Sequence, residues 1–252
     1  MSSDVKSAVR VLQIFQLFAE LKTPASLASI SQRLEMPKSS CQALLRTLEA
    51  HGYLSNRDDT KDYYPTRKLF EQMRVIVEQD PLLKDLMPLL QALSDETGET
   101  VFLARREGTL VHYMEVVQGR QTLRFAGLAG DRSPLYIGAA GQSLLGGMPK
   151  AERVALVNQL EFQRYSPNTI VSASALLKQI DEGLKKGWFL SIGGFQQEVS
   201  SIGNYVWLND NLYAIVIAAP TQRVERNQKS ISRHIVDLCA RVTQRPATRH
   251  TR

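Results

Sequence analysis

The sequence contains few of the residues from which disulfides and metal sites are built. Only two of its 252 residues are cysteines and four are histidines. Cys41 and Cys239 lie in apolar helical patterns at opposite ends of the chain, so neither a disulfide framework nor a zinc site is predicted, and a reducing compartment is expected. The histidines are scattered and match no metal-binding motif. We therefore predict no metal and no cofactor.

Longer motifs of enzymes and of membrane proteins are also missing. There is no glycine-rich phosphate loop, no dinucleotide-binding fingerprint and no nucleophile elbow. Asp181 and Glu182 are adjacent, so on a helix they point to different sides and do not pair for acid–base catalysis. No apolar run approaches the ~18 residues of a membrane span, and the N-terminus lacks the apolar core of a signal peptide. We expect a cytoplasmic protein with no membrane contact and no catalytic residue.

Charge says little about the binding partner. The formal net charge is +6, a sign that nucleic-acid-binding proteins often share, but the placement of the charges weakens that argument. Residues 1–67 carry nine basic and seven acidic side chains, whereas residues 221–252 carry eight basic and two acidic ones. Basic tails often only solvate a terminus. The spacing of apolar residues is therefore the more informative signal.

The most informative stretch lies between Ser26 and Leu54. Two short helical patterns are predicted there, separated by Met36-Pro37, because a helix is disfavoured immediately before a proline. Their apolar faces consist of Leu27, Ile30 and Leu34 in the first pattern and of Cys41, Leu44, Leu45 and Leu48 in the second. Ser26 is the predicted N-cap of the first helix, and Gly52 is a plausible left-handed stop after the second.

The opposite face of the second pattern is unusual for a surface helix. In place of long charged side chains it offers short polar groups, one amide and one arginine. Gln42 and Arg46 are predicted to read base edges, because Gln pairs with adenine and Arg with guanine. Residues at the start of this helix are predicted to contact phosphates. The full set of predicted DNA-binding residues is Ser26, Pro37, Lys38, Ser39, Ser40, Gln42, Ala43, Arg46 and Arg57.

The flanking segments predict a winged helix-turn-helix. Upstream, a longer amphipathic helix over residues 5–21 is able to pack across both short helices. Downstream, aromatic strand patterns on either side of the polar turn 55–62 predict a β-hairpin. Arg57 in that turn is within reach of a phosphate backbone or a minor groove, although acidic neighbours oppose a strong contact. Three helices and a hairpin favour DNA binding, and a winged helix that binds protein is the alternative.

A linker helix is predicted over residues 66–79. Its apolar stripe consists of Leu69, Phe70, Met73, Ile76 and Val77. Such a stripe serves either ordinary packing or a dimer seam, and the sequence leaves both open. Asp80-Pro81 then predicts the start of another helix, which Pro88 should bend or split.

From Glu99 onward the apolar period changes from 3.6 to 2, which predicts an α+β domain with a largely antiparallel sheet. The predicted strands cover residues 101–106, 109–117, 121–125, 188–192, 201–208 and 212–219. The predicted helices cover residues 150–160, 172–186 and 224–243, and a segment of small residues, Gly138–Gly141, opens another helical stretch up to Leu145.

Several short motifs occur in a characteristic order along the chain. They are Pro37-Lys38-Ser39-Ser40, Leu48-Glu49 followed by Gly52-Tyr53-Leu54, Tyr64-Pro65-Thr66, Glu99-Thr100-Val101, Pro134-Leu135-Tyr136 and Ala218-Ala219-Pro220. In this order and spacing the chain resembles the IclR family of bacterial transcriptional regulators over nearly its whole length. The resemblance implies a winged helix-turn-helix at 5–66, a linker helix at 67–80, a GAF-like effector-binding domain at 81–248, and dimers or tetramers on palindromic operators.

The sequence departs from the family pattern near the expected effector site. Tyr136 stands where members often have histidine, and Gln142 stands where they often have lysine. Many members carry an acidic run in the loop that corresponds to residues 193–198, where this chain has only Glu198. The ligand geometry of better-known members therefore does not transfer directly.

An effector pocket is nevertheless predicted around Gly138–Gly141. Small residues let a ligand approach closely, and amides at a helix start donate hydrogen bonds to an anion; close packing of helix on sheet is the alternative. The predicted ligand-binding residues are Phe125, Tyr136, Gly138, Ala139, Ala140, Gly141, Trp188, Ser191, Phe195 and Gln196. A carboxylate metabolite, aromatic or short-chain, is expected, with its carboxylate at the amides of residues 139–141.

The function predicted from the sequence is that of a DNA-binding transcriptional regulator whose operator binding responds to a carboxylate metabolite of a catabolic pathway. The alternative is a small-molecule sensor or enzyme-like domain whose winged helix contacts protein.

Overall fold

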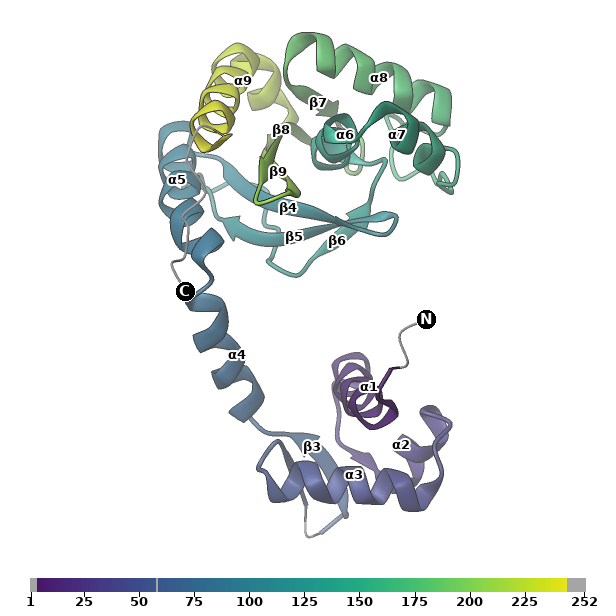
Figure 1. The fold of residues 1–252 in the computed structure, drawn as a ribbon. Coiled ribbons are helices and arrows are strands. Elements are labelled where there is room, and N and C mark those ends of the chain that lie inside the picture. The colour runs from purple at the N-terminus through teal and green to yellow at the C-terminus, as the bar shows by residue number, and fades with distance from the viewer. Residues whose placement is uncertain (1–3, 58, 244–252) are drawn as a thin grey trace. The chain divides into compact units, whose positions relative to one another are not determined.

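The computed structural model of the chain describes residues 4–57 and 59–243. The chain divides after Lys84 into two compact units, each with its own core (Figure 1). Asp58 of the predicted wing and the predicted end of the effector domain at 248 lie outside the described residues.

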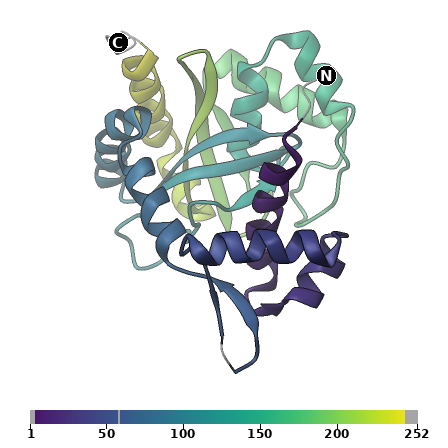
Figure 2. The same cartoon turned by 60° about the horizontal axis from the view of Figure 1, so that its bottom comes forward.

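The first unit is a winged helix-turn-helix, as the sequence predicts. Its elements are α1 (Lys6–Leu21), β1 (Ala25–Ser26), α2 (Leu27–Arg33), α3 (Lys38–Ala50), β2 (Leu54–Asn56), β3 (Asp62–Pro65) and α4 (Lys68–Glu78). The three strands pair antiparallel in the order β1-β3-β2. Figure 2 shows α3 lying across α1, with the β2–β3 hairpin projecting from the same unit. Strand β1 was not predicted, because two residues are too short for a period of 2 to show.

The apolar faces predicted for the short helices form the core of this unit. Ile30 of α2 and Cys41 and Leu45 of α3 are fully buried, together with Ile14 of α1. Burial raises the pKa of the Cys41 thiol, so this side chain behaves as a small apolar group.

Local hydrogen bonds set the ends of the short helices. The Ser26 hydroxyl accepts a hydrogen bond of 3.3 Å from the Ser29 amide, which confirms Ser26 as the N-cap of α2. The turn to α3 is held by Ser31, whose hydroxyl donates to the Met36 carbonyl at 2.6 Å. Gly52 has a φ of +74°, which confirms a left-handed residue after α3.

The second unit is built on one sheet. With α5 across its boundary, its elements are α5 (Pro81–Thr97), β4 (Thr100–Glu107), β5 (Leu110–Val117), β6 (Arg132–Pro134), α6 (Gly138–Gly147), α7 (Lys150–Val157), α8 (Ala173–Lys186), β7 (Phe189–Ile192), β8 (Val199–Leu208), β9 (Asn211–Pro220) and α9 (Thr221–Thr243). Six strands pair antiparallel in the order β6-β5-β4-β9-β8-β7. The predicted α+β class with an antiparallel sheet is confirmed.

Helices cover both faces of this sheet. Figure 1 shows α5 and α9 together at one side and α6, α7 and α8 at the other. Because successive side chains of a strand point to opposite faces, alternate residues of β9 enter two different cores. Val216 packs with α6, whereas Ile215 and Ile217 are buried on the side of α9. The largely apolar cavity lined by Phe102, Ala139 and Val216 lies on the α6 side.

One predicted strand of this unit is wrong, and one of the two outcomes predicted for Pro88 does not occur. The predicted strand 121–125 is a loop, because side chains rather than a neighbouring strand satisfy its carbonyls. Thr100 Oγ1 donates to the Phe125 carbonyl at 2.7 Å, and Arg223 Nη2 donates to the Leu123 carbonyl at 2.6 Å. Pro88 does not split the helix, since α5 runs unbroken from Pro81 to Thr97. Its buried stripe (Leu86, Leu90 and Leu93) outweighs the one hydrogen bond that proline removes.

Candidate DNA-binding face and effector cavity

The predicted contact residues of α3 lie together on its solvent side. Ala43 and Arg46 are exposed, as are Lys38, Ser39 and Ser40 at the start of the helix, and Gln42 is half-buried. Among the described residues none hydrogen-bonds the side chains of Gln42 or Arg46. These two groups therefore point away from the core with their hydrogen-bonding capacity unused.

The start of α3 is not capped. Its N-cap residue is Pro37, which has no side-chain acceptor for the amides of the first turn. The first turn of α2, by contrast, is capped by Ser26, so the hydroxyl of this predicted DNA-binding residue already serves the protein itself. An uncapped and exposed helix start is suited to a phosphate group.

The wing, which is the β2–β3 hairpin, carries basic and acidic side chains. The Arg57 guanidinium lies 3.5 Å from the Asp59 carboxylate, and both side chains are exposed. Arg57 is also anchored in the backbone, since its amide donates to the Asp62 carbonyl at 2.9 Å. The arginine is thus held at the hairpin, but an acidic neighbour competes with any phosphate for its charge.

The second unit contains a cavity with about 520 Å³ of empty space, part of which is open to solvent. Six of the predicted ligand-binding residues line it: Phe125, Gly138, Ala139, Ala140, Ser191 and Phe195. Phe102, Tyr113, Ser133, Ile137, Gly194, Val199, Ser201, Val216 and Ala218 complete the lining. The lining contains no acidic and no basic side chain.

One wall of the cavity is aromatic. The ring centroid of Phe102 lies 5.0 Å from that of Tyr113 and 5.6 Å from that of Phe125. The Tyr113 hydroxyl lies 3.2 Å from the Ser133 hydroxyl, and burial raises the pKa of Tyr113, so the phenol stays neutral. This wall therefore combines flat apolar surface with one pair of neutral hydrogen-bonding groups.

The start of α6 forms another part of the lining. Gly138 has a φ of +76°, and the side chain of the N-cap residue, Ile137, makes no capping hydrogen bond. The Ala139 amide donates to the Ser201 hydroxyl at 3.0 Å, which corrects the expectation that this amide is free for an anion. By helix geometry the amides of Gly138 and Ala140 have no carbonyl partner within α6. The Ser191 side chain is 6% exposed, and no hydrogen bond engages its hydroxyl within the described residues.

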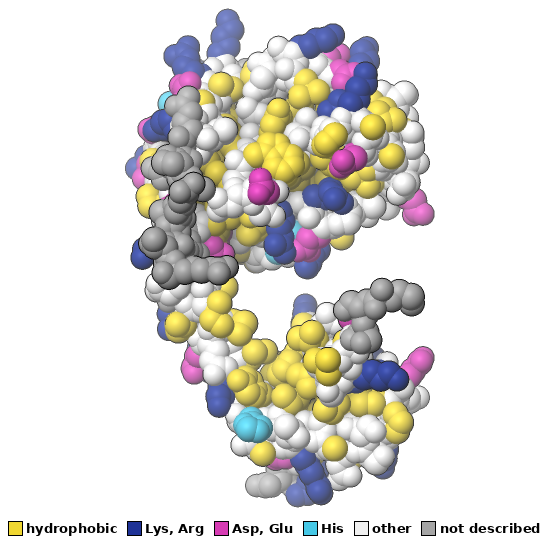
Figure 3. Space-filling view, in the orientation of Figure 1, with side chains coloured by type: hydrophobic (Ala, Val, Ile, Leu, Met, Phe, Trp, Pro, Cys, Tyr) yellow, Lys and Arg dark blue, Asp and Glu magenta, His cyan; other side chains and the backbone are white. Residues whose placement is uncertain are grey.

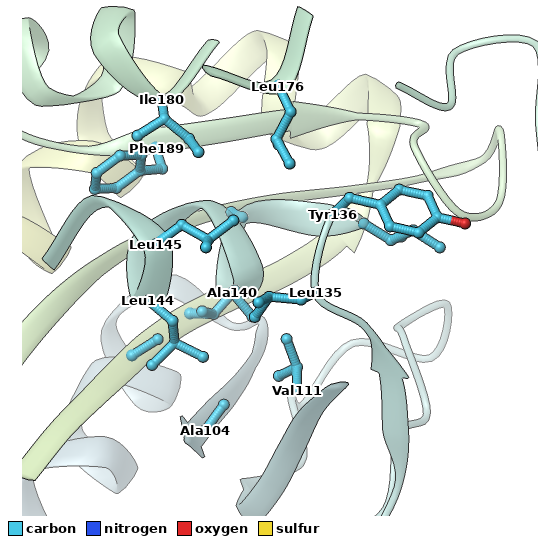
Figure 4. Close-up of a cluster of buried hydrophobic side chains, with 14 of the residues drawn as sticks. Ala104, Val111, Leu135, Tyr136, Ala140, Leu144, Leu145, Leu176, Ile180 and Phe189 are labelled. Atoms are coloured by element: carbon cyan, nitrogen blue, oxygen red, sulfur yellow. The ribbon is translucent and has the colours of Figure 1, made fainter. Parts of the chain in front are cut away.

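The rest of α6 is a packing element. Figure 4 shows Leu144 and Leu145 pointing into the cluster of buried side chains between the sheet and α8. A Cβ atom at Gly141 would lie 1.7 Å from the Leu135 carbonyl oxygen, so glycine is required there by close packing. Both hypotheses for the small-residue segment therefore apply, each to a different part of it. Gly138–Ala140 line the cavity, and Gly141 allows close packing of the helix.

Four predicted ligand-binding residues do not line this cavity. Gly141 is turned toward Leu135, and Gln196 is exposed. The Tyr136 hydroxyl donates to the Gln163 carbonyl at 3.1 Å and accepts from the Gln163 amide at 2.7 Å. The ring of Trp188 lies under the Lys186 ammonium group, 5.7 Å from its centroid. Proximity in sequence to the small-residue segment and to the 191–198 loop did not bring these side chains into the cavity.

A second loop fixes the position of the loop that bears Phe195. The Ser166 hydroxyl donates to the Gly193 carbonyl at 2.5 Å, and the Thr169 hydroxyl donates to the Gly194 carbonyl at 2.7 Å. The Phe195 and Tyr165 ring centroids are 5.2 Å apart. This contact between two loops brings Phe195 to the cavity.

Sequence reasoning missed most of the wall formed by the sheet. Phe102, Tyr113, Ser133 and Ser201 belong to four strands, and only the strand order places them around α6. Alternation within a strand identifies which residues share a face, but not which strand lies next to it. The described residues include no group of His, Cys, Asp and Glu suited to a metal ion. No described helix combines the length and hydropathy of a membrane span.

A winged helix-turn-helix followed by a separate domain with a largely apolar cavity is an architecture of ligand-responsive transcriptional regulators. Two family models match the chain: the IclR helix-turn-helix domain at residues 7–58, and the C-terminal domain of the bacterial transcriptional regulator IclR at residues 74–245. The chain belongs to the IclR family of bacterial transcriptional regulators. Its relatives are regulators of transcription, with DNA-binding and effector-binding domains.

Individual relatives are distant but span nearly the whole chain. The regulator KipR of Bacillus subtilis is 28% identical over 218 residues, 86% of each chain. The crystal structure of a transcriptional regulator from Rhodococcus sp. RHA1 has a TM-score of 0.80 at 20% identity and covers 96% of this chain and 98% of its own. An IclR homologue of Microbacterium hydrocarbonoxydans, solved in complex with 4-hydroxybenzoate, has a TM-score of 0.69 at 18% identity, with 93% and 99% covered.

Proposed function

We propose that this regulator binds a palindromic operator as a homodimer or homotetramer in the cytoplasm, and that a small carboxylate in the cavity controls that binding. DNA recognition is assigned to residues 5–66, the linker to 67–80 and effector binding to 81–248. The observation that supports the effector part is the cavity itself, which combines the first turn of α6 with a lining free of acidic side chains.

DNA binding is assigned to the exposed face of α3. Gln42 and Arg46 are placed to contact base edges, because their side chains are unengaged on the solvent side of the helix. The uncapped first turn, with Lys38, Ser39 and Ser40, is suited to a backbone phosphate. Arg57 of the wing adds a second phosphate contact.

A carboxylate is the effector class that the cavity favours. The amides of Gly138 and Ala140 and the unengaged Ser191 hydroxyl supply donors at one side. The Phe102–Phe125 wall supplies flat apolar surface, which suits an aromatic or short-chain body. The Microbacterium homologue that was solved with 4-hydroxybenzoate shows that this fold can hold an aromatic carboxylate.

Dimer formation is assigned to the linker helix. Apolar side chains of α4 are exposed, including Phe70 (60%) and Ile76 (62%). Figure 3 shows hydrophobic side chains gathered along this helix. A second copy of α4 would bury them, and a two-fold axis would pair two recognition helices with two half-sites.

The test begins with selection of the full chain's preferred sites from a pool of random double-stranded DNA. We expect the enriched sequences to hold two inverted half-sites, and gel-shift affinity for them to change with aromatic or short-chain carboxylates. The matched primary amides serve as controls and should have no effect, since they lack the charge. Selection without enrichment would overturn operator binding; amides as effective as acids would overturn the carboxylate assignment alone.

A further inference from the structure

The C-terminal end of the recognition helix is joined to the linker helix by side chains. Helix α3 ends at Ala50, and the carbonyls that follow it have no partner in the helix. Thr66 Oγ1 donates to the Gly52 carbonyl at 2.6 Å, and the Thr66 amide donates to the Tyr53 carbonyl at 2.9 Å. Lys68 Nζ donates to the His51 carbonyl at 2.9 Å. Thr66, just before α4, and Lys68, its first residue, thus donate hydrogen bonds to the successive carbonyls of residues 51–53.

The same turn of α4 also holds the ring of Tyr53. The Lys68 ammonium group lies 5.1 Å from the centroid of that ring. Gln72 Oε1 accepts a hydrogen bond of 2.8 Å from the Tyr53 hydroxyl. Lys68 and Gln72 are four residues apart and therefore lie on one face of α4. The other side of Tyr53 meets Phe15 of α1 edge-on, with 6.5 Å between centroids.

These contacts are placed for orientation rather than for core stability. The hydrogen bonds made by Lys68 and by the Tyr53 hydroxyl are exposed, and exposed polar contacts contribute little to folding. These contacts nevertheless connect several groups between the end of α3 and the start of α4. The Lys68 cation beside the last carbonyls of α3 also complements the dipole of that helix. Gly52 has a left-handed φ, and a Cβ atom added there would lie 3.7 Å from the Lys68 Cδ.

We infer that Thr66, Lys68 and Gln72 are positioning residues that set the angle between the recognition helix and the linker helix, and with it the spacing of the two half-sites. This inference rests on the proposed dimer through α4. One added base pair moves a half-site by about 3.4 Å and turns it by about 35°. If α3 and α4 form one rigid element, a dimer held together at α4 binds two half-sites best at one spacing. It binds more weakly when the spacer is one base pair shorter or longer.

The test uses the full chain and the DNA sequence enriched by selection. The spacer between the half-sites is shortened and lengthened in steps of one base pair, and a DNA with a single half-site is included. Lys68→Ala with Thr66→Val removes the two side-chain contacts, on the carbonyls of His51 and Gly52, and keeps the backbone contact on Tyr53. Tyr53→Phe removes only the hydrogen bond to Gln72. Lys68→Arg keeps a cation at the junction, and Glu71→Ala is the matched control on exposed α4.

Wild type and the two controls should prefer one spacing by about tenfold over its neighbours. In Lys68→Ala with Thr66→Val that preference should fall to about twofold, while affinity for the single half-site stays unchanged; Tyr53→Phe should lie between. Thermal melting of each variant by circular dichroism verifies that the unit is folded.

Three outcomes would overturn the inference. Variants that keep the wild-type spacing preference would show that the junction does not set it. An equal loss on all DNAs with a shallower salt dependence would make Lys68 a phosphate contact instead. A wild-type chain that binds selected DNA without any spacing preference would overturn the dimeric operator as well, which separates that failure from a failure of the junction alone.

Discussion

Neither α3 nor α6 is capped by the side chain of its own N-cap residue, yet α3 lies at the surface and α6 lies inside a core. On α3 burial is confined to one face, and the residues proposed to contact DNA are exposed. On α6 every residue from Ala139 to Gly146 is buried. A surface helix can recognise its partner through side chains. A buried helix has no room for long side chains beside a ligand, so backbone amides become its recognition groups.

This difference has a consequence for mutation. Side chains on the open face of α3 have few neighbours, so replacing them should change DNA binding while folding stays intact. Residues of α6 touch the sheet and α8 on all sides, so even one added methyl group is felt by the fold. Substitutions matched between the two helices can therefore separate recognition from stability.

The largest effect is expected from Gly141→Ala in α6. The added Cβ would lie 1.7 Å from the Leu135 carbonyl oxygen, and backbone cannot yield as a side chain can. We expect a loss of about 3 kcal/mol or more in the free energy of unfolding of the second unit. Urea unfolding followed by circular dichroism measures it, and Ser40→Ala on α3 is the matched control, expected within about 0.5 kcal/mol of wild type. Equal midpoints for both variants would contradict this contrast.

The next effect is expected from Ala140→Leu. Ala140 is buried and lines the cavity, so three added carbon atoms enter the space proposed for the effector. Affinity for an effective carboxylate should fall by about 100-fold or more, and DNA affinity without effector should be unchanged. Isothermal calorimetry measures the affinity for the carboxylate, and gel shifts measure the affinity for DNA.

The same substitution on the other helix gives the control. Ala43→Leu on the exposed face of α3 should weaken DNA binding and leave effector affinity as in wild type. An Ala140→Leu chain that still responds to its effector with wild-type affinity would place the effector site elsewhere.

A smaller effect is expected from Arg46→Ala on α3. Loss of a guanidinium that contacts a base should cost about 1–3 kcal/mol of binding and relax the preference at one base pair. Lys38→Ala should instead weaken binding to all sequences, because phosphate contacts carry no sequence information. Gel shifts on the selected site, on single-base variants and on random DNA make the distinction. Equal losses for Arg46→Ala on all three DNAs would refute base recognition by this residue.

The smallest effect on stability is expected from α4, whose apolar side chains are exposed like the polar face of α3. Phe70→Glu with Met73→Glu should change the unfolding free energy by about 0.5 kcal/mol or less, since both side chains are largely exposed. The mass in light scattering should nevertheless fall, because two apolar contacts of the proposed seam become charged. An unchanged mass would remove α4 from the interface.

Local signals in the sequence predicted the helices and the hairpin of the DNA-binding unit. The 3.6-residue period, the interruption at Met36-Pro37 and the glycine after α3 act over a few residues, and each predicted feature appears in the structure. The polar face of α3 could be predicted in the same way, because helix geometry alone decides which residues lie on one face. The family resemblance rested instead on the order and spacing of short motifs over nearly the whole chain.

The effector cavity depended on contacts that no local pattern contains. Strand pairing in the order β6-β5-β4-β9-β8-β7 brings Phe102, Tyr113 and Ser201 around the start of α6 from distant parts of the chain. The apolar alternation at 121–125 resembled a strand, but Thr100 and Arg223 hold that segment as a loop. Tyr136 and Trp188 are near the cavity residues in sequence and still point elsewhere. Periodicity records which side of an element is buried, and only the packed fold decides which partners bury it.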